Sequence, residues 1–146
     1  MKSTPSPELS RYLAQKPGAG HQPSPTHYVL QGADCVQSSD LALLFDLLPQ
    51  VRDKATRIKD SARLRLRLEL LSRYYAEAPV RSDPAAQRET AFVLYYFLQG
   101  RDLIPDSLPE IGLLDDALLV ETVFRRNRHT LESHWAARSR PWPREA

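Results

Sequence analysis

The chain has 146 residues and 42% apolar content, which fits one domain with a modest hydrophobic core. Its 20 basic and 18 acidic residues give a formal net charge of +2, whereas nucleic-acid-binding proteins usually concentrate a stronger positive charge on one face. The single cysteine, Cys35, excludes an internal disulfide bond and a zinc site made of cysteines.

Prolines and glycines interrupt the first part of the chain and predict a flexible N-terminal arm over residues 1–37. Ser6 followed by Pro7 is typical of a helix start, so we expect a short helix within this arm, over residues 7–15. Pro17 and the glycines that follow would end that helix. Residues 28–30 fit a brief extended piece.

Helical periodicity begins at Ser39 or Asp40 and predicts a folded domain over residues 38–138. We expect a first helix that ends or kinks near Pro49 and a second helical segment that continues to Ile58. A longer basic helix is predicted over residues 60–78, because this segment is long and lacks β-branched residues, although arginine and leucine alternate in it as in a strand. Its buried face is expected to carry Leu64, Leu68, Leu71 and Tyr75.

Asp83 followed by Pro84 predicts the start of another helix, which should run to about Gln99 and stop at Gly100. A last helix is predicted over residues 113–137, after a turn rich in aspartate and proline. These elements together predict an all-α fold, a small bundle of four or five helices. Residues 139–146 are expected to be a disordered basic tail.

The turn before the last helix holds four aspartates among apolar residues, and two interpretations of them stay open. In the first, which we favour, they cap turns by accepting backbone N–H bonds or lie in the first turn of the last helix, where negative charge is stabilised. In the second, they bind a hard cation, Mg²⁺, Mn²⁺ or Ca²⁺, for which carboxylates are suitable ligands. The four residues are Asp102, Asp106, Asp115 and Asp116.

The same turn resembles the signature of the YkvA-like family, a group of small, mostly bacterial helical proteins of undefined function. The resemblance covers about residues 95–123. It implies a helical hairpin around the turn and brings no catalytic residues. The residues that match the family motif are Asp102, Ile104, Pro105, Asp106, Pro109, Gly112, Asp115 and Asp116.

A basic stretch from residue 54 to residue 67 is the strongest sign of a binding surface. A basic amphipathic helix can lie on an anionic lipid surface or bind an acidic partner. The alternative is a solvated helix face whose charges are partly offset by neighbouring acids. Trp142, in the basic tail, is a further candidate anchor for such a contact. The surface-binding candidates are Lys54, Arg57, Lys59, Arg63, Arg65 and Arg67.

The sequence therefore favours a non-catalytic interaction module that docks to a protein partner or, peripherally, to an anionic membrane surface. The serines lie outside the nucleophile motif of hydrolases, and His129 and His134 are expected at or near the surface because their spacing does not suit a helical metal pair. We expect no cofactor, no nucleic-acid partner and no membrane span, and a cytoplasmic or membrane-peripheral location. The alternative is a divalent-metal-binding enzyme or sensor that uses the aspartate cluster.

Overall fold

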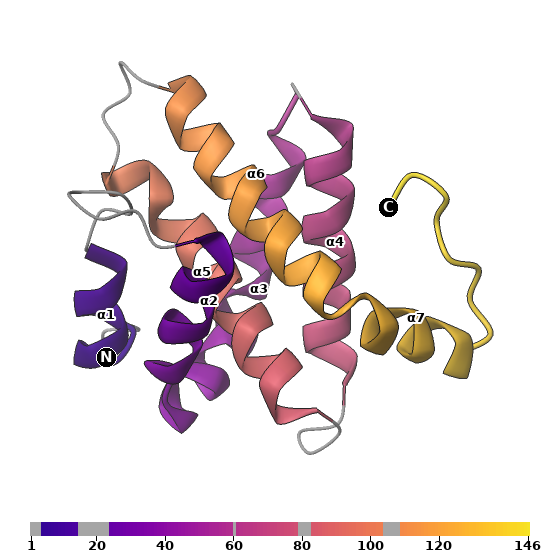
Figure 1. Cartoon of the computed structure of the whole chain (residues 1–146), viewed down its shortest axis with the longest axis horizontal. Coiled ribbons are helices and arrows are strands. Elements are labelled where there is room, and N and C mark those ends of the chain that lie inside the picture. Colours follow the sequence, from indigo (N-terminus) through magenta and orange to yellow (C-terminus); the bar gives the residue numbers. More distant parts are fainter. Residues whose placement is uncertain (1–3, 15–23, 60, 79–82, 104–108) are drawn as a thin grey trace.

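The computed structural model describes residues 4–14, 24–59, 61–78, 83–103 and 109–146, with the backbone alone over 99–103 and 109–115. These residues form seven helices and no strand (Figure 1), which confirms the all-α fold class. The expected number of four or five helices is not confirmed. The helices are α1 (Pro7–Ala14), α2 (Pro25–Asp34), α3 (Ser38–Thr56), α4 (Ala62–Glu77), α5 (Pro84–Leu103), α6 (Pro109–Arg126) and α7 (Arg128–Ala137).

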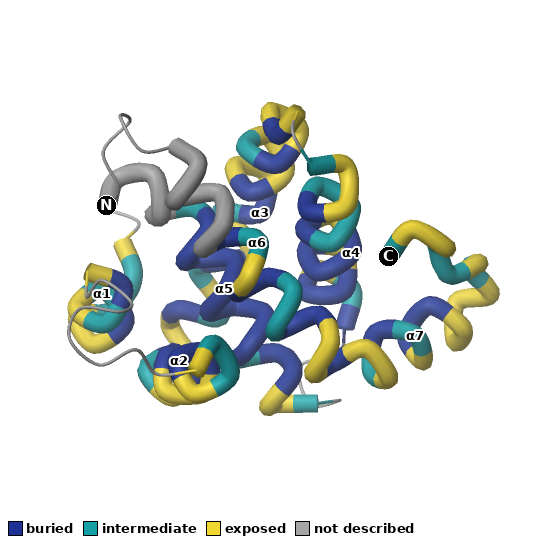
Figure 2. Tube along the Cα trace, turned by 45° about the horizontal axis from the view of Figure 1, so that its top comes forward, coloured by how far each residue is buried: buried dark blue, intermediate teal, exposed yellow. Residues whose placement is uncertain are grey.

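Helix α5 is the centre of the bundle and contacts α1, α2, α3, α4 and α6. Every residue from Ala91 to Phe97 is buried, as expected for a stretch of helix that is apolar on all sides (Figure 2). Asp83 caps the start of this helix, since its Oδ1 accepts the Ala86 N–H at 3.0 Å, and the predicted start is confirmed. The predicted stop at Gly100 is wrong, because the helix continues to Leu103.

Helix α3 passes through Pro49 without ending, so the expected end of the helix at that residue is wrong, whereas the kink expected as the alternative stays a prediction. Proline removes the N–H that would bond the carbonyl of the residue four positions earlier, which is Phe45. Both Phe45 and Pro49 are exposed, so this carbonyl lies on the side of the helix where water can replace the missing bond. The basic stretch that follows forms helix α4, as predicted, with Leu68 and Tyr75 fully buried.

The N-terminal helices α1 and α2 pack against the core, which differs from the expectation of a flexible arm. Leu9, Leu13 and Val29 are fully buried. The buried carboxylate of Asp40, at the start of α3, accepts hydrogen bonds from the backbone N–H and the hydroxyl of Ser6 at 2.6 and 2.7 Å. Residues 28–30 lie in α2 and are helical, not extended.

The predicted last helix divides at Asn127 into α6 and α7. The buried amide of Asn127 donates to the Val123 carbonyl at 2.9 Å and to Glu89 Oε1 at 3.1 Å, which satisfies this polar group where α6 gives way to α7. Figure 1 and Figure 2 both show α7 on the opposite side of the bundle from α1. Among the described helices, none has a stretch long and apolar enough to cross a bilayer.

Candidate functional site

Two cations of the predicted basic stretch bind backbone carbonyls within the protein. Lys54 Nζ donates to the carbonyl of Phe97 and lies 4.6 Å from the centroid of the Phe97 ring, which ties α3 to α5. Arg65 Nη1 donates to the Ile58 carbonyl at 2.6 Å and joins α4 to the segment before it. These two side chains stabilise the packing of the helices, so less of their positive charge is available to bind a partner at the surface.

The other cations where α3 leads into α4 face the solvent. Arg57 forms an ion pair with Asp53 at 2.9 Å, but both side chains are about two-thirds exposed, and such pairs contribute roughly 0.3–0.5 kcal/mol. Lys59 and Arg63 are exposed and form no hydrogen bond or ion pair with a described residue. This corner of the molecule therefore carries positive charge that the described part of the chain does not neutralise.

Arg67 lies between α4 and α6, and its side chain is only 12% exposed. Its guanidinium carbon lies 5.2 Å from the centroid of the Phe124 ring, a cation–π distance that holds the group in place. Its Nη1 is 3.6 Å from Glu121 Oε1, which is longer than a hydrogen bond, and its buried Nε has no hydrogen-bond partner among the described residues. Burial lowers the pKa of Arg67, Glu121 raises it, and the nearby Arg63 and Arg125 lower it.

Helix α6 adds one further cation to this region. Arg125 is 72% exposed and lies 3.4 Å from Glu121, so Glu121 is shared by two arginines from two helices. The sequence analysis did not identify the pair of Glu121 and Arg125, although a glutamate four residues before an arginine is a usual ion-pair spacing on a helix. We define the basic face as Lys59, Arg63, Arg67 and Arg125.

The aspartate-rich turn joins α5 to α6, and these two helices pack against each other as a hairpin. Asp102 lies near the end of α5, Pro109 opens α6, and Gly112 and Asp115 follow within α6. Asp116 also lies in α6 and is buried. The predicted position of Asp115 and Asp116 in the first turn of this helix is wrong, because α6 begins at Pro109 and the helix-dipole effect is confined to the first turn.

Most of the aspartate motif lies outside the described side chains, so both interpretations of the acids stay predictions. Ile104, Pro105 and Asp106 fall outside the described residues, and Asp102 and Asp115 are described by their backbone alone. Within the described side chains, no group of three metal-ligating residues comes together. The geometry of a divalent-cation site at Asp102, Asp106, Asp115 and Asp116 therefore stays open.

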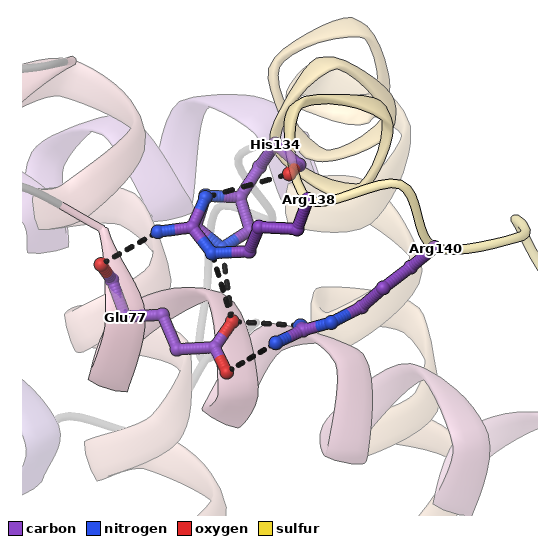
Figure 3. A network of polar contacts seen from close by, with 4 residues as sticks. All are labelled: Glu77, His134, Arg138 and Arg140. Carbon is purple, nitrogen blue, oxygen red and sulfur yellow. Dashed lines mark hydrogen bonds and ion pairs between the residues drawn. The ribbon is translucent and has the colours of Figure 1, made fainter.

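A polar cluster holds the C-terminal segment against the end of α4 (Figure 3). The carboxylate of Glu77 accepts two hydrogen bonds from Arg140, at 2.8 and 2.9 Å, and a third contact from His134 Nε2 at 3.1 Å. The bonds from Arg140 lower the pKa of Glu77 to about 2. Arg138 Nη1 lies 3.1 Å from His134 Nδ1, and because a guanidinium can only donate, this nitrogen is the acceptor and His134 carries its proton on Nε2.

His134 is buried, so its expected place at the surface is wrong. The final segment, expected to be a disordered tail, instead folds back over α6 and α7. Trp142 stacks on Phe124 with ring centroids 5.8 Å apart and meets Trp135 edge to face at 5.7 Å. Arg140 and Trp142 therefore anchor the C-terminal segment to the protein's own helices.

A second charged cluster fastens the junction of α6 and α7 to the central helix. Arg126 donates two hydrogen bonds to the buried Glu89, at 3.0 and 3.1 Å, and these bonds raise the pKa of Arg126. Asn127 shares the same carboxylate. Because all three groups are used in packing, Arg126 is not part of the basic face.

Comparison with known protein families gives a match over the helical hairpin. A family model described as "Protein of unknown function (DUF1232)" matches residues 89–121, which run from Glu89 in α5 through the aspartate-rich turn to Glu121 in α6. Searches of curated proteins and of solved structures find no match. The chain is therefore similar, over the helical hairpin, to a family whose function is not defined.

Proposed function

We propose that this protein is a non-catalytic interaction module that docks an acidic segment of a protein partner on its basic face. The supporting observation is the set of exposed cations around the start of α4, where Lys59 and Arg63 have no described partner. Arg125 adds an exposed guanidinium from α6, and Glu121 is the acid beside it. A surface with this excess of positive charge attracts acidic groups and increases the rate at which they are encountered.

A protein partner fits this surface better than a lipid bilayer does. Recognition of anionic lipid usually relies on clusters of about four to eight Lys or Arg residues, so a face with four cations and an acid among them is at the weak end of that range. The basic face has four, with Glu121 between two of them, while Lys54 and Arg65 bind carbonyls inside the protein.

We further propose that the protein belongs to the YkvA-like family and works in the cytoplasm. The family motif and the match over residues 89–121 support the first point.

Binding of a fluorescent poly-glutamate peptide, followed by anisotropy at several salt concentrations, tests this proposal. We expect Lys59→Gln combined with Arg63→Gln to weaken binding roughly two- to thirtyfold, because each exposed ion pair contributes roughly 0.2–1 kcal/mol. Wild-type affinity should fall as salt rises. The matched control is Arg11→Gln with Arg73→Gln, which removes the same charge at exposed positions outside the basic face.

Equal loss in the two double variants would show that net charge, and not the basic face, controls binding, and would reject the proposal. Sedimentation with vesicles containing phosphatidylserine is the second arm. Strong binding to these vesicles, together with none to the peptide, would replace the acidic protein partner with a membrane surface.

A further inference from the structure

Arg67 is an unusual member of the basic face, because its guanidinium is mostly buried and yet not all of its N–H donors have acceptors among the described residues. A buried guanidinium normally gains several hydrogen bonds to offset the loss of water. Within the described part of the chain, Arg67 has one loose ion pair, at 3.6 Å to Glu121, and its buried Nε has no hydrogen-bond partner. The Phe124 ring nevertheless fixes its position from below, at 5.2 Å. The guanidinium is thus held in place while part of its hydrogen-bonding capacity is unused.

Three guanidinium groups lie near one another here, and Glu121 is the one described carboxylate that forms an ion pair with any of them. Arg63 lies one helical turn before Arg67 on α4, so their side chains share a face of the helix. Arg125 approaches the same carboxylate, Glu121, from α6 at 3.4 Å. The cluster therefore keeps two positive charges in excess. We call Arg63, Arg67, Glu121 and Arg125 the arginine cluster.

We propose that the arginine cluster is a binding site for a phosphate monoester, carried by a phosphorylated residue within the acidic segment of the partner. A phosphomonoester carries a charge of about −1.5 to −2 near neutral pH, which matches the excess charge of the cluster, whereas a carboxylate would neutralise half of it. Arginine is also suited to phosphate, because its planar fork donates two parallel hydrogen bonds to two oxygens.

Glu121 acts as an internal counter-ion that the phosphate displaces. Its side chain is 37% exposed and forms two loose ion pairs, at 3.4 and 3.6 Å, so it can turn outward into water. The N–H groups of Arg67 that faced Glu121 can then donate hydrogen bonds to the phosphate, while the Phe124 ring keeps the guanidinium in place. Because the guanidinium is already ordered before binding, less conformational entropy is lost when the ligand arrives.

This inference rests on the proposed docking of an acidic partner, and the test separates the two. The probes are a glutamate-rich peptide with one phosphoserine and the same peptide with glutamate at that position. We expect the phosphopeptide to bind about tenfold more tightly, because the dianion forms additional charge-assisted hydrogen bonds. We expect Arg125→Gln to remove this preference without affecting folding, since Arg125 is 72% exposed. Arg73→Gln, an exposed change elsewhere on α4, should leave the preference intact.

Glu121→Gln provides the sharpest readout, because it removes the internal competitor without adding a cation. We expect it to tighten phosphopeptide binding roughly 1.5- to 5-fold, because the phosphate no longer has to displace a carboxylate from an exposed ion pair. The Arg67 side-chain Nε–H resonance should shift on phosphopeptide binding. Equal affinities for both peptides would overturn the phosphate site and leave the docking proposal standing, whereas no binding of either would overturn both. Tighter binding to vesicles of phosphatidic acid than to the phosphopeptide would assign the phosphate to a lipid and also overturn the inference.

Discussion

The close approach of α2 to the central helix depends on the absence of a side chain at Gly32. A Cβ atom at this position would lie 2.3–2.6 Å from three ring carbons of Phe92 on α5, far inside van der Waals contact. The Phe92 ring cannot move away easily, because it is fully buried. The rings of Tyr12, Tyr28 and Tyr96 pack against it, with centroids 5.7, 5.7 and 6.3 Å away.

We therefore expect Gly32→Ala to destabilise the protein, although alanine is the better helix former. Replacing a glycine within a helix by alanine contributes about 1 kcal/mol of stability. Overpacking a close-packed core costs about 1–3 kcal/mol, and the distances at Phe92 place this change toward the upper part of that range. The net loss should be about 1–2 kcal/mol, which lowers Tm by roughly 2–8 °C for a chain of this length.

Urea and thermal unfolding of the variant measure this effect. Gln31→Ala, at an exposed position in the same helix, is the control and should be neutral or slightly stabilising. Combining Gly32→Ala with Phe92→Leu should reduce the cost of the glycine substitution, because the ring that causes the clash is gone. A Gly32→Ala protein as stable as the wild type would refute the argument that this contact requires glycine.

Three further predictions concern acidic groups. The contribution of Glu77 to stability should be fully present above about pH 4.5, the usual pKa of a glutamate, and should be lost as the pH falls through about 2, its lowered pKa in the folded protein. Glu77→Gln should flatten this part of the stability–pH curve. Trp142 fluorescence should report release of the C-terminal segment. Asp40→Ala should cost roughly 1.5–3 kcal/mol, because bonds from Ser6 and Gln37 to a buried carboxylate are lost, and urea unfolding measures it. If the aspartate motif binds a divalent cation, Mg²⁺, Mn²⁺ or Ca²⁺ should raise the Tm of the wild type but not of Asp106→Asn or Asp116→Asn; a wild type that does not respond would reject that hypothesis.

Local signals in the sequence were sufficient where one residue pattern decides the structure. The Asp83-Pro84 pair marks the start of α5, and the lack of β-branched residues over 62–77 favours a helix for α4 in spite of its alternating pattern. The same kind of signal was available at Ser24 and Pro25, which open α2 as Ser6 and Pro7 open α1. The many prolines of the N-terminal segment suggested disorder, so the helix start at Ser24 and Pro25 was not predicted.

Contacts between distant segments could not be predicted in this way. Phe124, Trp135 and Glu77 order Trp142 and Arg140 through contacts that span between 7 and 63 residues of the chain. A tail of prolines, arginines and one tryptophan is compatible with disorder until these partners are known. His134 was similarly placed by its spacing from His129, although its position depends on Glu77 in another helix.

The basic face shows why counting charges along one helix gives an incomplete view of a binding surface. Lys54 and Lys59 are five residues apart and look equivalent in the sequence, yet Lys54 lies over the Phe97 ring and Lys59 faces solvent. The difference arises from α5, whose carbonyls near Phe97 attract the nearer lysine. Arg67 differs from both lysines, because α6 buries its guanidinium against Phe124 and the described residues do not supply acceptors for all of its N–H groups. A ligand that supplied them would therefore be bound most strongly where α4 and α6 meet, and not along the exposed edge of α4.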